Sequence, residues 1–130
     1  GSGNDFLHDL DKPADAAPFS LRPYLKNLPS DQVAALAQMV TIQPGRVVSM
    51  ALSRNEHCQM TLLAFADGES VSEECYFGDT LYYVLEGEMP LQMGDRVYPL
   101  RAGDCMAVPA HTLHAVGGSL PFKLLQITLQ

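Results

Sequence analysis

A chain of 130 residues is long enough to bury a hydrophobic core without disulfides or structural metals, and we expect it to form one domain. Hydrophobic residues make up 47% of the chain and charged residues 18%, a balance typical of packed globular proteins and not of disordered ones. The formal net charge of −7, with no run of Lys or Arg, argues against nucleic acids and anionic membranes as partners.

The cysteines and the hydropathy pattern indicate the cellular compartment in which we expect the protein. No segment reaches the ~18 to 20 consecutive apolar residues that cross a bilayer, and the first residues do not resemble a signal peptide. Cys58, Cys75 and Cys105 are widely spaced and include no Cys-x-x-Cys pair, so they predict neither a disulfide framework nor a thiolate zinc site. We therefore expect a cytoplasmic protein in a reducing compartment.

The N-terminal third of the chain is expected to lie outside the main fold. Residues 1–3, Gly-Ser-Gly without an initiator Met, are typical of a vector remnant. Residues 4–45 are rich in proline and predict an extended arm with one short helix, which Ser30 would cap and Val33 to Val40 would form. The same letters also fit a strand at Val33 to Ala35 followed by a single helical turn.

Residues 46–130 consist of short apolar runs separated by turn pairs such as Asp67-Gly68, Glu86-Gly87 and Gly94-Asp95. Most of these turns lie about 8 to 14 residues apart, the spacing expected for an antiparallel sandwich or barrel. No helix-length connection separates the runs, so a parallel βαβ unit is not expected. The predicted strands are Val47 to Leu52, Cys58 to Phe65, Leu81 to Leu85, Pro90 to Met93, Arg96 to Leu100, Cys105 to Val108, His114 to Val116 and Phe122 to Leu129.

Two stretches of this region have matching architecture. In one, Gly103 opens an apolar run that Pro109 stops, and His114 follows where the next strand should begin, so its side chain is aimed from that strand. In the other, Gly68 and Gly87 enclose a regularly spaced set of polar residues. That set consists of Glu74, Tyr76 and Thr80.

These two stretches resemble the two motifs of the cupins, small jelly-roll barrels in which a short hairpin separates the motifs. The phrase from Tyr83 to Glu88, Tyr-Val-Leu-Glu-Gly-Glu, strengthens the resemblance. It implies an all-β cupin jelly-roll barrel over residues 46–130. The family typically draws four metal ligands from the motifs, and His114 is the one that this chain retains, so its metal-binding motifs are degenerate.

Strand geometry brings the candidate side chains together. Alternate residues of a strand share a face, so Glu74 and Tyr76 point one way, as do Thr80 and Tyr82 in the next strand. If these faces line the barrel interior, their polar groups meet the imidazole of His114 in a small, otherwise apolar cavity, the usual form of a ligand pocket. The predicted ligand-binding residues are Glu74, Tyr76, Thr80, Tyr82, His111 and His114.

Each of these residues also has a structural interpretation. His114, after a proline corner, fits a hydrogen-bonded structural histidine. Glu74 fits a solvent-facing carboxylate. Tyr76 and Tyr82 fit core aromatics whose hydroxyls reach the rim, and His111 lies in a turn, where it faces solvent or the barrel mouth.

Three functions fit such a cavity. We prefer the binding of a small organic molecule without catalysis, because it does not depend on the missing ligands. The second is a metal-dependent cupin enzyme of dioxygenase or isomerase type, in which His114 and Glu74 hold Fe, Mn, Ni or Zn with an incomplete ligand set. The third is a metal-independent epimerase or isomerase with His114 as general base and Tyr76 as general acid, as in some cupin epimerases.

A homodimer is the expected assembly. A jelly roll exposes edge strands, and the proline-rich arm is well placed to cover one across a twofold axis. This expectation comes from analogy with the fold. The expected partners are thus a second copy and a small-molecule ligand, with neither nucleic acid nor membrane.

Overall fold

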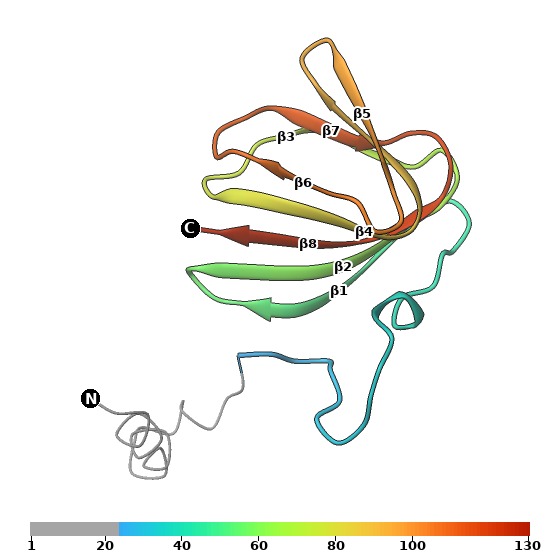
Figure 1. Cartoon of the computed structure of the whole chain (residues 1–130), viewed down its shortest axis with the longest axis vertical. Coiled ribbons are helices and arrows are strands. Elements are labelled where there is room, and N and C mark those ends of the chain that lie inside the picture. Colours follow the sequence, from blue (N-terminus) through green and yellow to red (C-terminus); the bar gives the residue numbers. More distant parts are fainter. Residues whose placement is uncertain (1–23) are drawn as a thin grey trace.

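A computed structural model describes residues 24–130, which form eight strands and one 3-10 turn (Figure 1). The all-β prediction is confirmed, and three strands begin and end where the sequence predicts. No helix in this part of the chain has the length and apolarity needed to cross a membrane. The elements are η3 (Leu36–Gln38), β1 (Val47–Arg54), β2 (Cys58–Phe65), β3 (Ser70–Glu74), β4 (Asp79–Met93), β5 (Arg96–Arg101), β6 (Cys105–Val108), β7 (His114–Gly117) and β8 (Phe122–Leu129).

The strands form two antiparallel layers that share β4. One layer has the order β1-β2-β8-β4-β6 and the other the order β3-β7-β4-β5. In Figure 1, β1, β2 and β8 lie on the lower side of the barrel and β3 and β7 on its upper side, so the sheet curls over on itself. This arrangement is the curled antiparallel barrel that the cupin resemblance implies.

Strand β4 passes from one layer to the other at Gly87. The sequence predicts a turn at Glu86-Gly87 between two short strands, and this prediction is wrong, because the chain bends here without leaving the strand. The register with β8 shifts between Val84 and Glu86, and Gly87 has a φ of +80°. A Cβ atom at Gly87 would lie 2.3 Å from the carbonyl oxygen of Pro121. Glycine is required because the two backbones approach too closely for a side chain.

Strand β3 is absent from the predicted strands. Its residues, Ser-Val-Ser-Glu-Glu, show none of the apolar alternation that identifies a half-buried strand. It lies at the end of the second layer and pairs with β7, where Glu74 is opposite His114. Pairing with β7, rather than local propensity, makes this segment a strand.

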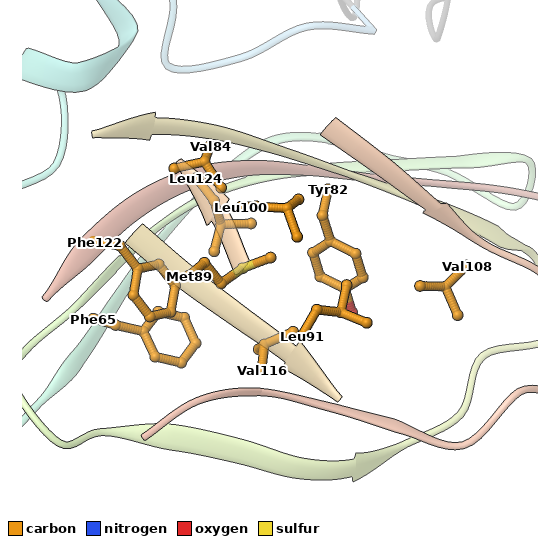
Figure 2. Packing of buried hydrophobic residues seen from close by; sticks show 10 residues of the cluster. All are labelled: Phe65, Tyr82, Val84, Met89, Leu91, Leu100, Val108, Val116, Phe122 and Leu124. Atoms are coloured by element: carbon orange, nitrogen blue, oxygen red, sulfur yellow. The ribbon is translucent and has the colours of Figure 1, made fainter. Parts of the chain in front are cut away.

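Inward-facing side chains of both layers form the barrel core. Figure 2 shows Phe65 and Phe122 at one end of this cluster, Val108 at the other, and Tyr82 between them. The two phenyl rings stack with their centroids 4.5 Å apart. Burial of one such side chain contributes about 1.5–3 kcal/mol. An exposed ion pair such as Arg101–Glu88 contributes less than about 1 kcal/mol, so the core holds the barrel together.

A second apolar cluster joins the arm to the outer face of the first layer. Val40 of the arm is buried in it together with Leu52 of β1 and Leu62 of β2. The ammonium group of Lys123 donates a 2.7 Å hydrogen bond to the carbonyl oxygen of Ala37. The described part of the arm thus covers the barrel of its own chain. The homodimer in which the arm reaches a second copy stays a prediction.

The short helix predicted over Val33 to Val40 is reduced to the three-residue turn η3. Ala35, immediately before it, is extended, with φ −103° and ψ 119°, and no side chain caps the turn, so the predicted capping role of Ser30 is wrong. The alternative of an extended segment followed by one helical turn is closer to the structure. Eight residues are too few for a stable isolated helix, and packing on the sheet decides the conformation instead.

The crossing of β4 at Gly87 generates a stability prediction. Gly87→Ala should lower the free energy of unfolding by about 3 kcal/mol or more, because the new Cβ meets the Pro121 carbonyl at an unfavourable φ. Gly94 is the matched control, since its φ is +60° and nothing lies within 4 Å of an added Cβ. Gly94→Ala should cost about 1 kcal/mol, the backbone penalty alone. Urea denaturation measures both, and equal losses would contradict the close approach at Gly87.

Candidate functional site

A cavity of about 120 Å³ lies between the two layers of the barrel, and we call it the inner cavity. Strands of both layers contribute its walls. Glu74 ends β3, Tyr76 follows that strand, Tyr82 lies in β4 and Gln126 in β8. The structure therefore brings together three of the predicted ligand-binding residues. The full lining is Leu63, Phe65, Val71, Glu74, Tyr76, Tyr82, Val116 and Gln126.

His114 is buried behind Tyr82 and is held at both ring nitrogens. Its Nδ1 lies 2.8 Å from the carbonyl oxygen of Thr112, which can only accept, so Nδ1 carries a hydrogen. In the neutral ring Nε2 is then an acceptor, and the Tyr82 hydroxyl, 2.6 Å away, donates to it. His114 is not among the residues that line the inner cavity; it reaches the cavity through Tyr82.

The two phenols of the inner cavity are neutral at physiological pH. Burial raises the pKa of Tyr82, and the neighbouring Tyr76 and the charge of Glu74 raise it further. Burial also raises the pKa of Tyr76 above its usual value of 10.0, with Glu74 adding to the shift and the side chain of Gln126 opposing it. Both phenols therefore act in the site as O–H groups and not as phenolates.

Thr80 and His111, which the sequence also predicts to bind ligand, lie outside the lining of the inner cavity. The buried Thr80 hydroxyl shares a 2.9 Å hydrogen bond with the hydroxyl of Thr128. His111 is exposed, with a φ of +61°, and its ring packs edge-on against Phe77 at a centroid distance of 5.6 Å. Its backbone N–H donates a 2.8 Å hydrogen bond to the carbonyl oxygen of Tyr76, so it positions the segment that carries Tyr76.

Gln126 lines the inner cavity but is absent from the predicted site residues. Phe122, Leu124 and Thr128 are buried, and Gln126 shares their face of β8 because a strand has a period of two. The signal available in the sequence was therefore a polar residue at a position of the strand whose alternate neighbours are mostly apolar and are buried.

A second pocket, of about 260 Å³, adjoins the inner cavity at Tyr76, and we call it the outer pocket. It lies at the ends of β2 and β8 and includes the exposed residues Phe77 and Gln130. Tyr76 lines both the inner cavity and the outer pocket. The outer pocket is lined by Cys58, Gln59, Cys75, Tyr76, Phe77, Thr128 and Gln130.

The described residues supply an incomplete donor set for a metal ion. His114 and Glu74, the ligands that the sequence suggests, lie opposite each other in β7 and β3. No group of three or more His, Cys, Asp or Glu side chains within residues 24–130 is arranged to hold an ion. In addition, Nε2 of His114 already accepts the hydrogen of Tyr82. These residues therefore do not fit the full ligand set of a structural or catalytic metal.

Stability at alkaline pH should report the ionisation of two phenols, that of the buried Tyr82 and that of the half-buried Tyr76. Folding raises the pKa values of Tyr76 and Tyr82, so their stabilisation is complete below about pH 10, the unfolded value, and is lost as the pH rises above it. Each phenol should lower the free energy of unfolding by up to about 1.4 kcal/mol per pH unit. Urea denaturation from about pH 9 to about pH 11.5 measures the slope. Tyr76→Phe and Tyr82→Phe should each reduce it, and an unchanged slope in both variants would contradict the burial of these phenols.

The hydrogen bond between His114 and Tyr82 generates a second prediction. His114→Ala should lower the free energy of unfolding by about 2–4 kcal/mol, because it leaves a void and an unpaired Tyr82 hydroxyl. A double-mutant cycle with Tyr82→Phe should give a coupling energy of about 1 kcal/mol or more. The control is His111→Asn, at an exposed position of positive φ that asparagine tolerates, and it should change stability by less than about 0.5 kcal/mol. If the losses of stability in the two single variants simply add in the double variant, the interaction between His114 and Tyr82 is contradicted.

Comparison with known proteins identifies the fold family. A sequence profile described as "Cupin domain" matches residues 61–128, more than half of the chain. A solved cupin superfamily protein from Desulfitobacterium hafniense is 48% identical with a TM-score of 0.79, and the match covers 82% of this chain and 98% of that chain. A Cupin 2 conserved barrel domain protein from Leptotrichia buccalis is 32% identical with a TM-score of 0.70, covering 72% and 46%.

A third structure extends the likeness in fold. A conserved protein of unknown function from Streptococcus pyogenes is 21% identical with a TM-score of 0.81, and the match covers 85% of this chain and 96% of that chain. A search of curated proteins found no match. The jelly-roll topology, the profile match and the 48% identity together show that the chain belongs to the cupin family.

Proposed function

We propose that this cupin binds a small organic molecule in the inner cavity. The observation that carries the proposal is the cavity itself, in which the polar groups of Glu74, Tyr76 and Gln126 converge within otherwise apolar walls. Most binding sites for small molecules have this composition, with a few polar groups that orient the ligand and an apolar lining that expels water.

The volume of the inner cavity limits the size of the ligand. Its 120 Å³ is less than the roughly 300–1,000 Å³ of sites for drug-sized molecules. It is slightly less than the volume of an engineered cavity of about 150 Å³ that holds benzene. A ligand that fits entirely inside therefore has about five or six non-hydrogen atoms. A longer ligand would extend past Tyr76 into the outer pocket.

Binding is better supported than acid–base catalysis by His114. Its Nδ1 donates to Thr112 and its Nε2 accepts from Tyr82, so both nitrogens have partners within the protein. A general base needs a ring nitrogen within hydrogen-bond reach of the ligand. Tyr82 occupies that place, and the role of His114 is to hold the Tyr82 hydroxyl in position.

An NMR screen tests the proposed function. Compounds of about four to six non-hydrogen atoms, including amines, alcohols and carboxylates, are titrated into the labelled protein. At least one class should shift the amide resonances of Val71 and Gln126 in a saturable manner. Gln126→Leu, which retains the bulk of the side chain but loses its polar group, should weaken that binding by about tenfold.

A cavity-filling variant provides the matched comparison. Val71→Phe places a phenyl ring in the inner cavity and should abolish binding, whereas Val97→Phe makes the same change at an exposed position of β5, 56% accessible, and should leave binding intact. Native-like spectra establish that both variants fold. The proposal fails if no compound shifts the cavity resonances, or if the folded Val71→Phe protein binds as well as the unmodified one.

A further inference from the structure

Glu74 places a carboxylate in the wall of the inner cavity without a nearby cation. It ends β3 opposite His114 and is half-buried. The ion pairs found within residues 24–130 are Glu56–His57, Glu88–Arg101 and Glu86–Lys123, and none of them includes Glu74. The lining of the inner cavity contains no Lys, Arg or His. Because a carboxylate loses hydration when it is partly buried, a cation that enters the cavity would compensate it.

The same arrangement disfavours an anionic ligand. In a cavity of about 120 Å³, a carboxylate or phosphate would come within a few ångströms of Glu74, and like charges at such separations repel strongly in a partly desolvated site. No positive charge in the lining would offset that repulsion. The other polar groups of the lining are all neutral: the hydroxyl of Tyr76, the amide of Gln126, and the hydroxyl of Tyr82, which donates to His114.

The aromatic residues of the lining favour a cation over a neutral molecule. Phe65, Tyr76 and Tyr82 all line the inner cavity, and the faces of their rings carry negative potential that attracts organic cations. The formal net charge of −7 also raises the local concentration of cations around the protein. A carboxylate beside aromatic rings is a combination suited to an ammonium group, with the alkyl part of the ligand against Leu63 and Val116.

We propose that the ligand of the inner cavity is a small organic cation, a protonated amine of about five or six non-hydrogen atoms whose ammonium group pairs with Glu74. This inference rests on the proposed function and specifies its ligand class. The ammonium donates to the Glu74 carboxylate, and Gln126 offers a second acceptor through its side-chain oxygen. The hydrocarbon part fills the apolar end of the cavity and displaces water from it.

Three probes of equal size separate charge from shape. Butylamine, which is protonated at pH 7, 1-butanol and propionate each contain about five non-hydrogen atoms, close to the size that the cavity admits. Isothermal titration calorimetry at pH 7 should show butylammonium binding about tenfold or more tighter than 1-butanol. Propionate should show no measurable binding.

Two charge-neutralising variants assign the preference to Glu74. Glu74→Gln retains the size of the side chain and removes its charge, and it should reduce the affinity for butylammonium by about tenfold or more while 1-butanol binding is retained. Glu69→Gln changes the net charge of the protein by the same amount at a position outside the lining, and it should leave both affinities unchanged. Circular dichroism establishes that both variants are folded.

The outcomes distinguish the ligand class from the proposed function. If none of the three probes binds and the NMR screen also finds no ligand, both the ligand class and the proposed function are wrong. If 1-butanol or propionate binds the unmodified protein as tightly as butylammonium, the cavity binds ligands but the assignment of an amine is overturned. The assignment is also overturned if Glu74→Gln binds butylammonium with the unmodified affinity.

Discussion

The continuity of β4 through Gly87 is the constraint on which the barrel depends. This strand pairs with β6 and β8 before the glycine and with β5 and β7 after it, so it belongs to both layers. The contact of Gly87 with the Pro121 carbonyl leaves no room for a side chain. Because the strand does not break, Tyr82 faces the second layer from the first, and Met89 and Leu91 pack into the same core. The position of the inner cavity follows from this crossing.

A short chain of hydrogen bonds then fixes one wall of the inner cavity. The Thr112 carbonyl accepts from His114, and His114 accepts from Tyr82, so the Tyr82 hydroxyl has a defined orientation. The buried histidine thus acts on the site indirectly. The groups left for a ligand are the carboxylate of Glu74, the hydroxyl of Tyr76 and the amide of Gln126, two of which come from outside the strands that the sequence identifies most clearly. This division of roles separates His114 and Tyr82, which hold each other, from the groups that we propose contact the ligand.

The fold was largely predictable because turns and apolar runs are local features. Strands β2, β6 and β8 have the predicted bounds, since each is a clear apolar run between turn residues. Strand β3 was not predictable in this way, because its polar letters become a strand only by pairing with β7. The arm lost most of its predicted helix because contacts with the sheet, distant in sequence, determine its conformation.

The sequence predicts some of the residues that line the inner cavity better than it predicts how they are arranged. Strand parity predicts that Glu74 and Tyr76 share a face, and both line the inner cavity although β3 ends at Glu74. The alternation of side chains along β8 would also place Gln126 in the lining of the inner cavity, but only after β8 is known to face that cavity. His114 shows the limit most clearly, since the spacing that predicts it cannot reveal that Tyr82 lies in front of it. Which of the two side chains reaches the cavity depends on how several strands pack together, and spacing within one strand does not reveal this.

A crystal structure of the protein grown with butylammonium chloride would show whether the inner cavity binds an organic cation at Glu74. We expect density for the cation inside the inner cavity, with its nitrogen at hydrogen-bond distance from the Glu74 carboxylate and its alkyl chain against Leu63 and Val116. An inner cavity closed by the ring of Tyr76, or a cation bound instead at surface carboxylates while the cavity holds none, would contradict it.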